Sequence, residues 1–201
     1  MFKTLAKNSI ISQMEANNIK WVFICGIDNV LLKIVDPLFL GITIANNASI
    51  SSKSIFKEDP YGTEWIFARI NGRPGLLDSK RITPEMRFAA DINGDFLYRE
   101  ANMLSHLMSI DTVRKASALE LPYHRAFKKS TFLNSEGMKQ VPEEPNSFKF
   151  EQFIFDVFPH FDDLLLLRVG KDEFAPIKDL YGIYSPEVAT RLYVKNNMAS
   201  A

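Results

Sequence analysis

The sequence has little cysteine and no long apolar run. Its 201 residues include one cysteine, Cys25, which excludes an intramolecular disulfide framework and fits a reducing compartment. Cys25 lies inside an apolar stretch, where a thiol serves as a small buried hydrophobe. No apolar stretch approaches the roughly 18 residues of a membrane-spanning helix, and the first residues lack the pattern of a signal peptide. We therefore expect a cytoplasmic protein with no membrane partner.

The chain also lacks an excess of charge of either sign. Lysine and arginine total 24, and aspartate and glutamate total 24, so the formal net charge is zero. Nucleic acids and anionic membrane surfaces attract proteins through a surplus of basic residues. We therefore expect no nucleic acid among the partners of this protein.

Several familiar catalytic motifs are missing as well. The 9 glycines form neither Gly-x-Gly-x-x-Gly nor Gly-x-x-x-x-Gly-Lys, the patterns that cradle phosphates. The three histidines, His106, His124 and His160, do not have the spacing of a zinc site, and no Gly-x-Ser-x-Gly elbow is present. Covalent catalysis therefore has no candidate nucleophile. A nucleotide, if one binds, lacks the usual glycine-rich cradle in this sequence.

What the sequence does contain is an ordinary apolar content with an unusual share of phenylalanine. Apolar residues make up 46% of the chain, enough for a chain of this length to bury a sizeable core. Of the 16 phenylalanines, six lie between residues 148 and 161. Residues 2–16 have apolar side chains at helical spacing, which predicts an amphipathic helix. Residues 21–27 are almost wholly apolar, which is typical of a strand covered on both faces in a parallel sheet.

The remaining pattern predicts a mixture of helices and strands. Asp36-Pro37 has the form of a capped helix start, and Asn71-Gly72 has the form of a hairpin turn. The other expected elements are an edge strand at 49–57, a helical stretch from 102 to 116, a loop or weak hairpin at 130–147, a helix at 148–158, a buried strand at 164–169 and a helix from Ser185-Pro186. The fold class is α/β, with a parallel centre and antiparallel hairpin additions.

Two charged residues are candidates for phosphate chemistry. Asp28 follows the buried strand at its carboxyl end, where open α/β sheets place their ligand crevice. A carboxylate there can hold a divalent cation against phosphate oxygens, or it can cap the next turn. Lys178 lies in a loop after Pro176, where it can meet a phosphate or remain solvated.

The phenylalanine-rich segment offers a candidate wall for a binding pocket. Phe153 and Phe155 are two residues apart and cannot share one face of a helix. We therefore expect one of them to line a cavity rather than join the core.

Six short blocks of the sequence resemble one enzyme family when they are taken in order. They are Gly26-Ile27-Asp28-Asn29, Val35-Asp36-Pro37, Asn102 with His106, Phe153-Ile154-Phe155-Asp156-Val157-Phe158, Glu173-Phe174-Ala175-Pro176-Ile177-Lys178 and Ser185-Pro186-Glu187. The family is that of the UDP-N-acetylglucosamine pyrophosphorylases, among the wider UDP-sugar pyrophosphorylases. The resemblance extends over essentially the whole chain and corresponds to the C-terminal half of the catalytic domain.

This resemblance implies a fold and a reaction. The fold is a Rossmann-like nucleotidyltransferase domain with a mostly parallel mixed sheet. The reaction joins UTP and a sugar 1-phosphate, either N-acetylglucosamine 1-phosphate or glucose 1-phosphate, to give a UDP-sugar and pyrophosphate. Such chemistry depends on positioning and charge neutralisation rather than on a protein nucleophile.

The resemblance also assigns roles to individual residues. By this carry-over Asp28 holds Mg²⁺ beside the phosphates, and Lys178 reaches the phosphates. Asn102 hydrogen-bonds the sugar, and Phe153 and Phe155 shape the sugar pocket near the N-acetyl group. These roles suit the side chains, since an amide binds hydroxyls and aromatic rings pack on sugar faces.

The sequence departs from the family pattern at one expected sugar contact. Asp78 stands where the family typically has glutamate, and its carboxylate is one methylene shorter. The resemblance otherwise implies that residues 1–201 form the sugar-binding half of the domain. The family's glycine-rich nucleotide loop and its C-terminal small domain have no counterpart in this sequence, so we expect a domain truncated at the N-terminus.

Three hypotheses follow for the function. The first is a uridylyltransferase that uses the residues named above. The second is a non-catalytic protein that binds sugar phosphates with the same core. The third is an interaction half that works with a separate N-terminal chain.

Overall fold

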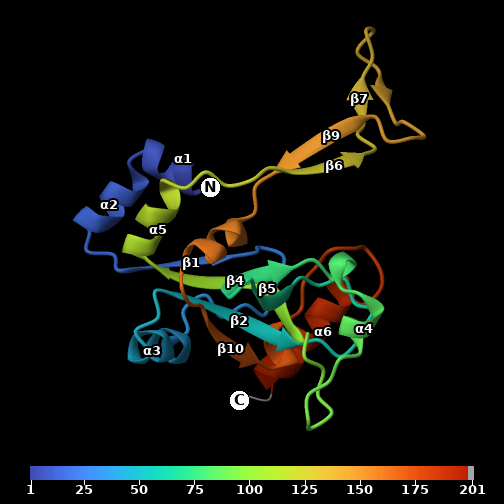
Figure 1. The fold of residues 1–201 in the computed structure, drawn as a ribbon. Helices are drawn as coiled ribbons and strands as arrows, with labels where there is room; N and C mark the ends of the chain where they lie inside the picture. Colours follow the sequence, from blue (N-terminus) through green and yellow to red (C-terminus); the bar gives the residue numbers. More distant parts are fainter. Residues whose placement is uncertain (199–201) are drawn as a thin grey trace.

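The computed structural model describes residues 1–198, which form a mixed six-stranded sheet with helices packed around it (Figure 1). The strand order is β10-β2-β5-β3-β4, and β1 also pairs with β5. The strands are β1 (Trp21–Cys25), β2 (Ile50–Phe56), β3 (Ile66–Ile70), β4 (Arg73–Leu77), β5 (Glu100–Ser109) and β10 (Leu165–Val169). The α/β class and the mixed character of the sheet expected from the sequence are confirmed. The expected parallel centre is wrong, because within residues 1–198 only β10 and β2 of this sheet pair in parallel and the pairings of the central β5 are all antiparallel.

The long strand β5 is the centre of the sheet. β2 lies along one side of β5, while β1 and β3 share the other side, and all three pairings are antiparallel. β10 joins β2 in the parallel pair of this sheet. β1, β2 and β10 therefore run in one direction, so their carboxyl ends lie toward the same edge of the sheet.

Six α-helices and three short 3₁₀ helices are present within residues 1–198. They are α1 (Phe2–Lys7), α2 (Ile10–Ala16), α3 (Pro37–Ala45), α4 (Pro84–Arg87), α5 (Ile110–Ser117), α6 (Pro186–Met198), η1 (Ser79–Arg81), η2 (Ile154–His160) and η3 (Lys171–Glu173). No helix in this range combines the length and the apolar character needed to cross a lipid bilayer.

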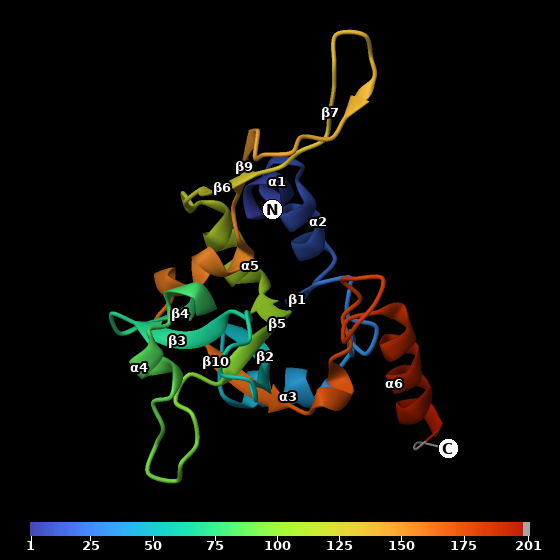
Figure 2. The ribbon, with the colours of Figure 1, turned by 90° about the vertical axis from the view of Figure 1, so that its right-hand side faces the viewer.

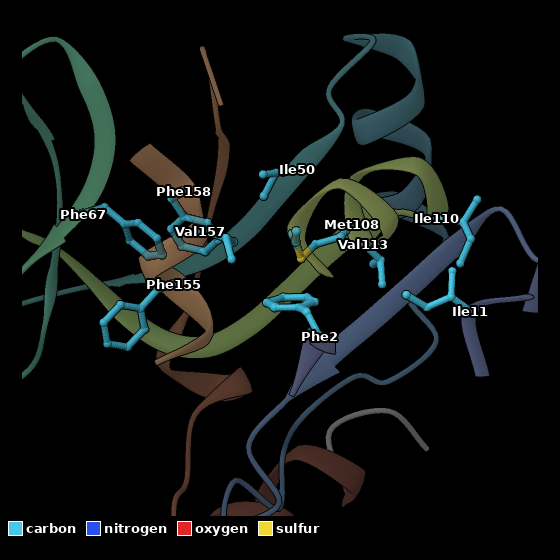
Figure 3. Close-up of a cluster of buried hydrophobic side chains, with 11 residues drawn as sticks. Phe2, Ile11, Ile50, Phe67, Met108, Ile110, Val113, Phe155, Val157 and Phe158 are labelled. Carbon is cyan, nitrogen blue, oxygen red and sulfur yellow. The ribbon is translucent and has the colours of Figure 1, made fainter. Parts of the chain in front are cut away.

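The main hydrophobic core lies where α1, α2, α5 and η2 meet the sheet. Phe2, Ile11 and Val113 are almost completely buried between the three helices. Phe155 and Phe158 of η2 extend this core toward Phe67 of β3 (Figure 3).

A ribbon of antiparallel strands projects from the body of the molecule (Figure 2). It consists of β6 (His124–Lys128) paired with β9 (Ser147–Glu151), and of a tip formed by β7 (Phe132–Leu133) and β8 (Lys139–Gln140). The weak hairpin expected at 130–147 is confirmed by this tip.

Local signals in the sequence identified several elements. Asp36 caps α3 by accepting hydrogen bonds from the N–H groups of Leu38 and Phe39, and Pro37 takes the first helical position. Asn71 and Gly72 form the turn between β3 and β4 with φ values of 53° and 77°. The helix expected after Ser185 is α6. The helix expected at 2–16 is present as α1 and α2, separated at Asn8-Ser9.

Four expected elements were wrong in type or position. Residues 102–108 are not helical but belong to β5, and the helix α5 begins only at Ile110, capped by Ser109. Residues 148–151 are not helical either, because β9 pairs with β6, and only the short η2 follows. The expected edge strand at 49–57 is the central β2, buried between β10 and β5. The strand expected at 21–27 is only partly buried and pairs antiparallel with β5.

The turn at Asn71-Gly72 yields a test of backbone conformation. A Cβ at Gly72 meets no atom within 4 Å, so Gly72→Ala would be opposed only by the positive φ. We expect this substitution to lower the free energy of unfolding by about 1–2 kcal/mol. Gly41 in the middle of α3 is the matched control, since it also has open space and lacks a positive φ. Gly41→Ala should raise the free energy of unfolding, measured by chemical denaturation, by about 1 kcal/mol. Equal effects of the two substitutions would contradict the role of the positive φ at Gly72.

Candidate functional site

Asp28 lies just beyond β1, at the edge of the sheet toward which the parallel-running strands end. Its backbone carbonyl accepts a hydrogen bond of 2.8 Å from the N–H of Ile177. Its carboxylate folds over Gly26, where an added Cβ would come within 2.7 Å of Oδ1. Within residues 1–198 the carboxylate has no hydrogen-bond or ion-pair partner, so it stays available to a ligand.

The buried side chain of Asn29 connects this segment to the loop after β10. Its Nδ2 donates to the carbonyl of Glu173 at 2.8 Å, and its Oδ1 accepts from the N–H of Ala175 at 2.8 Å. Together with a bridge between Asn29 and Pro176, these bonds fix residues 173–177 against the end of β1. Two segments almost 150 residues apart in the sequence are thereby held side by side.

Lys178 follows directly on this fixed segment. Its N–H donates to the carbonyl of Tyr184 at 2.9 Å, and its ammonium lies 5.2 Å from the centre of the Tyr184 ring. The side chain is exposed. Because Ile177 is hydrogen-bonded to Asp28, the structure brings the two residues expected at phosphates to neighbouring positions.

A bulge in β5 places Asn102 beside the same edge. Ser52 pairs with His106 and Ser54 pairs with Asn102, so three residues of β5 lie opposite Lys53. The middle one, Leu104, has a φ of 54°. The Asn102 Oδ1 accepts from the N–H of Leu104 at 2.9 Å, and the Leu104 carbonyl accepts from the N–H of Gly26. Asn102 is therefore tied to the chain segment that carries Asp28.

Phe153 and Phe155 form a stacked pair. Their ring centres are 4.8 Å apart with an interplanar angle of 15°. The expectation that the two rings cannot share a face was wrong, because Phe153 is in an extended conformation before η2 rather than in a helix. Phe155 is also part of the hydrophobic core, with 8% of its surface exposed.

Trp65 connects the aromatic pair to Asn102. Its indole lies 5.5 Å from the ring of Phe153 and 4.9 Å from that of Phe155. Its carbonyl accepts a hydrogen bond of 2.8 Å from the N–H of Asn102. Asp78 is close to Trp65 in the sheet. Ile66, which follows Trp65, pairs with Leu77, which precedes Asp78. The Asp78 carboxylate caps η1 by accepting from the N–H of Lys80.

A buried ion cluster supports the site from within the sheet. Lys53 of β2 is completely buried, and its ammonium lies 2.5 Å from Asp36 Oδ2 and 2.6 Å from Glu173 Oε2. Glu173 also pairs with Lys33 at 2.9 Å. Burial raises the pKa of Asp36, but the hydrogen bonds from Lys53 and from two helix N–H groups outweigh it, so the pKa is lower than usual. The cluster thus fastens the loop that leads to Lys178 onto β2.

A cavity of about 570 Å³ lies at the end of β2, and Tyr184, whose ring is close to the Lys178 ammonium, forms part of its lining. Its lining includes Ala101, Glu64 and Tyr184. Burial, and then the nearby Glu64 carboxylate, raise the pKa of the Tyr184 hydroxyl. The cavity is therefore located beyond the carboxyl ends of β2 and β10, where open α/β sheets bind ligands.

The site around Asp28 can be compared with the ligands that a magnesium ion requires. Residues 1–198 contain no group of three or more acidic, histidine or cysteine side chains that could hold a metal by themselves. Mg²⁺ usually takes only one or two protein carboxylates and completes its shell with water and phosphate oxygens. A single unpaired carboxylate at Asp28 beside an exposed lysine fits that mode of binding.

Comparisons with known proteins place this arrangement in a family. The family model described as UTP--glucose-1-phosphate uridylyltransferase matches residues 1–198. The chain belongs to this uridylyltransferase family. A Dictyostelium discoideum relative named for UDP-N-acetylglucosamine pyrophosphorylase is 32% identical over 193 residues, which cover 93% of this chain. The UDP-N-acetylglucosamine pyrophosphorylase of Saccharomyces cerevisiae is 30% identical over 97% of the chain.

Solved structures of the family show the same fold. An Entamoeba histolytica protein named for UDP-N-acetylglucosamine pyrophosphorylase gives a TM-score of 0.89 at 27% identity, covering 98% of this chain and 50% of that one. The chain spans 40% of the length of the Dictyostelium relative and 43% of the yeast enzyme. The uridylyltransferase family is therefore the one expected from the sequence blocks.

Two features of this candidate site escaped the sequence reasoning. Lys53 stands in the run Ile-Ser-Ser-Lys-Ser-Ile-Phe, and a lysine within a buried strand is itself a signal for buried carboxylate partners. Trp65 directly precedes a hairpin strand, and nothing in the local sequence connects it to Phe153 and Phe155, which lie almost 90 residues away.

Proposed function

We propose that this chain carries the sugar 1-phosphate side of a uridylyltransferase site. In this proposal Asp28 and Lys178 act at the phosphates, while Asn102 and Asp78 contact the sugar and Phe153 with Phe155 forms an aromatic wall. The substrates are UTP and a sugar 1-phosphate, the products are a UDP-sugar and pyrophosphate, and a separate N-terminal half is a candidate partner.

One observation carries the proposal. The backbone hydrogen bond from Ile177 to Asp28, reinforced by the Asn29 side chain, places a carboxylate and a lysine at one edge of the sheet. Because the backbone that carries both side chains is fixed by hydrogen bonds, only the side chains have to adjust when a phosphate arrives, and such positioning is the main requirement for phosphoryl chemistry.

The roles follow from the charges of these groups. Asp28 would hold Mg²⁺, which supplies positive charge beside the phosphate oxygens when it is bound. Lys178 would place its ammonium on the phosphates as a mobile point charge. Asn102 still has its Nδ2 available to donate to a hydroxyl, since within residues 1–198 only its Oδ1 takes part in a hydrogen bond. None of these steps requires a covalent intermediate with the protein.

Substitution of Asp28 tests this assignment. We expect Asp28→Asn to lower pyrophosphate release from UTP and sugar 1-phosphate by about 100-fold, because the neutral amide would hold Mg²⁺ beside the phosphates less well. The assay contains Mg²⁺ and is run with the chain alone and with a separate N-terminal half of a relative. Asp162→Asn is the matched control, since Asp162 precedes β10 at the opposite edge of the sheet and pairs with Arg73.

The outcomes separate the hypotheses. Equal turnover by the Asp28→Asn and Asp162→Asn variants would remove the phosphate role of Asp28. Binding of a sugar 1-phosphate without turnover under either condition would favour the non-catalytic binder. Turnover only with the added half would favour the two-chain enzyme.

A further inference from the structure

The surface of the aromatic pair is already taken by other side chains of this protein. Phe153 and Phe155 cover one face of each other, and the His124 ring lies 4.6 Å from Phe153. The His124 Nε2 is hydrogen-bonded to Asp156 at 2.9 Å, and Asp156 also accepts from the N–H of Phe153. The histidine is thus fixed in place against the outer ring.

Trp65 packs against both rings. The indole contacts Phe153 and Phe155 at centre distances of 5.5 and 4.9 Å, with tilts of 59° and 45°. Trp65 packs with them against the main core and is itself only partly buried. Trp65 and Phe153 are both only partly buried, so the indole is one of the aromatic groups at the surface of this cluster.

The position of Trp65 is central among the residues assigned to the sugar. The Trp65 carbonyl accepts a hydrogen bond from the N–H of Asn102. Ile66, the residue after Trp65, pairs with Leu77 of β4, and Asp78 is the next residue after Leu77. In the proposed site, a ligand that contacts both Asn102 and the aromatic pair also lies next to Trp65. A side chain of that size reduces the space for a bulky substituent on the sugar much more than for a hydroxyl.

We propose that Trp65 determines the sugar specificity of this site, by filling the space in front of the aromatic pair. The site then takes a hexose 1-phosphate with a hydroxyl at C2 in preference to an N-acetylated hexosamine 1-phosphate. This inference rests on the proposed function, because it uses Asn102, Phe153 and Phe155 as the sugar side of the site.

Calorimetric titration of the full chain with two probes tests the specificity. The probes are glucose 1-phosphate and N-acetylglucosamine 1-phosphate, each with Mg²⁺. We expect the unaltered chain to bind glucose 1-phosphate at least about tenfold more tightly, and Trp65→Ala to shift the ratio toward the N-acetylated sugar by about tenfold or more. Trp21→Phe alters the other tryptophan, in β1, and should leave the ratio unchanged.

Removal of an indole from the core also affects folding, so thermal unfolding of each variant is followed by circular dichroism. If Trp65→Ala does not fold, Trp65→Phe carries the test, since it keeps an aromatic ring and should shift the ratio in the same direction by a smaller factor.

The possible results distinguish the role of Trp65 from the proposed function. An unchanged ratio in a folded Trp65 variant, or a preference of the unaltered chain for the N-acetylated sugar, overturns the role of Trp65 and leaves the proposed function intact. Equal weakening of both sugars by Trp65→Ala also overturns it, because the indole is then a stacking surface. Failure of every variant to bind either sugar phosphate overturns the inference and the sugar-binding proposal together.

Discussion

Replacement of Lys53 by methionine is expected to lower the free energy of unfolding by about 3–5 kcal/mol, because it leaves buried carboxylates without their counter-ion. The Lys53 side chain is 0% exposed, and Asp36 and Glu173, which contact it, are 13% and 9% exposed. Methionine fills nearly the same volume as lysine. The loss of stability therefore reports the removal of the charge and not the creation of a cavity. Urea denaturation of the variant and of the unaltered chain gives the difference.

An exposed ion pair serves as the comparison for this variant. Lys171 pairs with Glu58 at 2.5 Å, with both side chains more than half exposed. Lys171→Met should cost less than about 1 kcal/mol. Addition of Asp36→Asn and Glu173→Gln to Lys53→Met should restore part of the stability, since the unpaired charges are then removed. A Lys53→Met protein as stable as the Lys171→Met protein would show that the cluster is not a source of stability.

Acid is expected to destabilise this protein through His106. This imidazole is completely buried between the rings of Phe67 and Phe158, and its Nδ1 is hydrogen-bonded to Ser52 Oγ at 2.7 Å. Burial lowers the pKa of His106 from 6.5 to about 3. Between these values the unfolded chain binds a proton that the folded chain does not. The free energy of unfolding should therefore fall as the pH decreases below 6.5, by about 1.4 kcal/mol for each pH unit from this residue.

The contribution of His106 is isolated by comparing slopes. His106→Gln keeps a polar group next to Ser52 but does not titrate in this range, so its stability should decline less steeply between pH 6.5 and 4. His160 is exposed, and His160→Gln should retain the slope of the unaltered chain. Identical slopes for all three proteins, measured by chemical denaturation at each pH, would be inconsistent with a neutral buried His106.

Local signals predicted the parts of the fold that are governed by local interactions. Asp36-Pro37, Asn71-Gly72 and Ser185-Pro186 each specify a cap or a turn through their own side chains or backbone angles, and all three are where they were expected. The blocks around Asp28 and Lys178 likewise indicated the family, since they are short and specific.

The elements that were predicted wrongly depend on distant partners. Residues 102–108 include apolar side chains that suit either a helix or a strand. They form a strand because they pair with β1 and β2. Residues 148–151 become a strand because β6, more than 20 residues earlier, pairs with them. The same limit hid the contact of Trp65 with Phe153, which exists only after η2 has docked on the sheet.

The Asn29 side-chain amide continues the hydrogen bonding of a β-ladder beyond the end of β1. It offers an acceptor and a donor to the passing chain, as a backbone peptide would, and so it sets the position of residues 173–177 from the β1 side. The alignment of Lys178 with Asp28 then does not depend on the number of residues between β10 and Glu173. The turn at residues 170–172 is therefore a place where related chains can differ in length while the two charged groups keep their spacing.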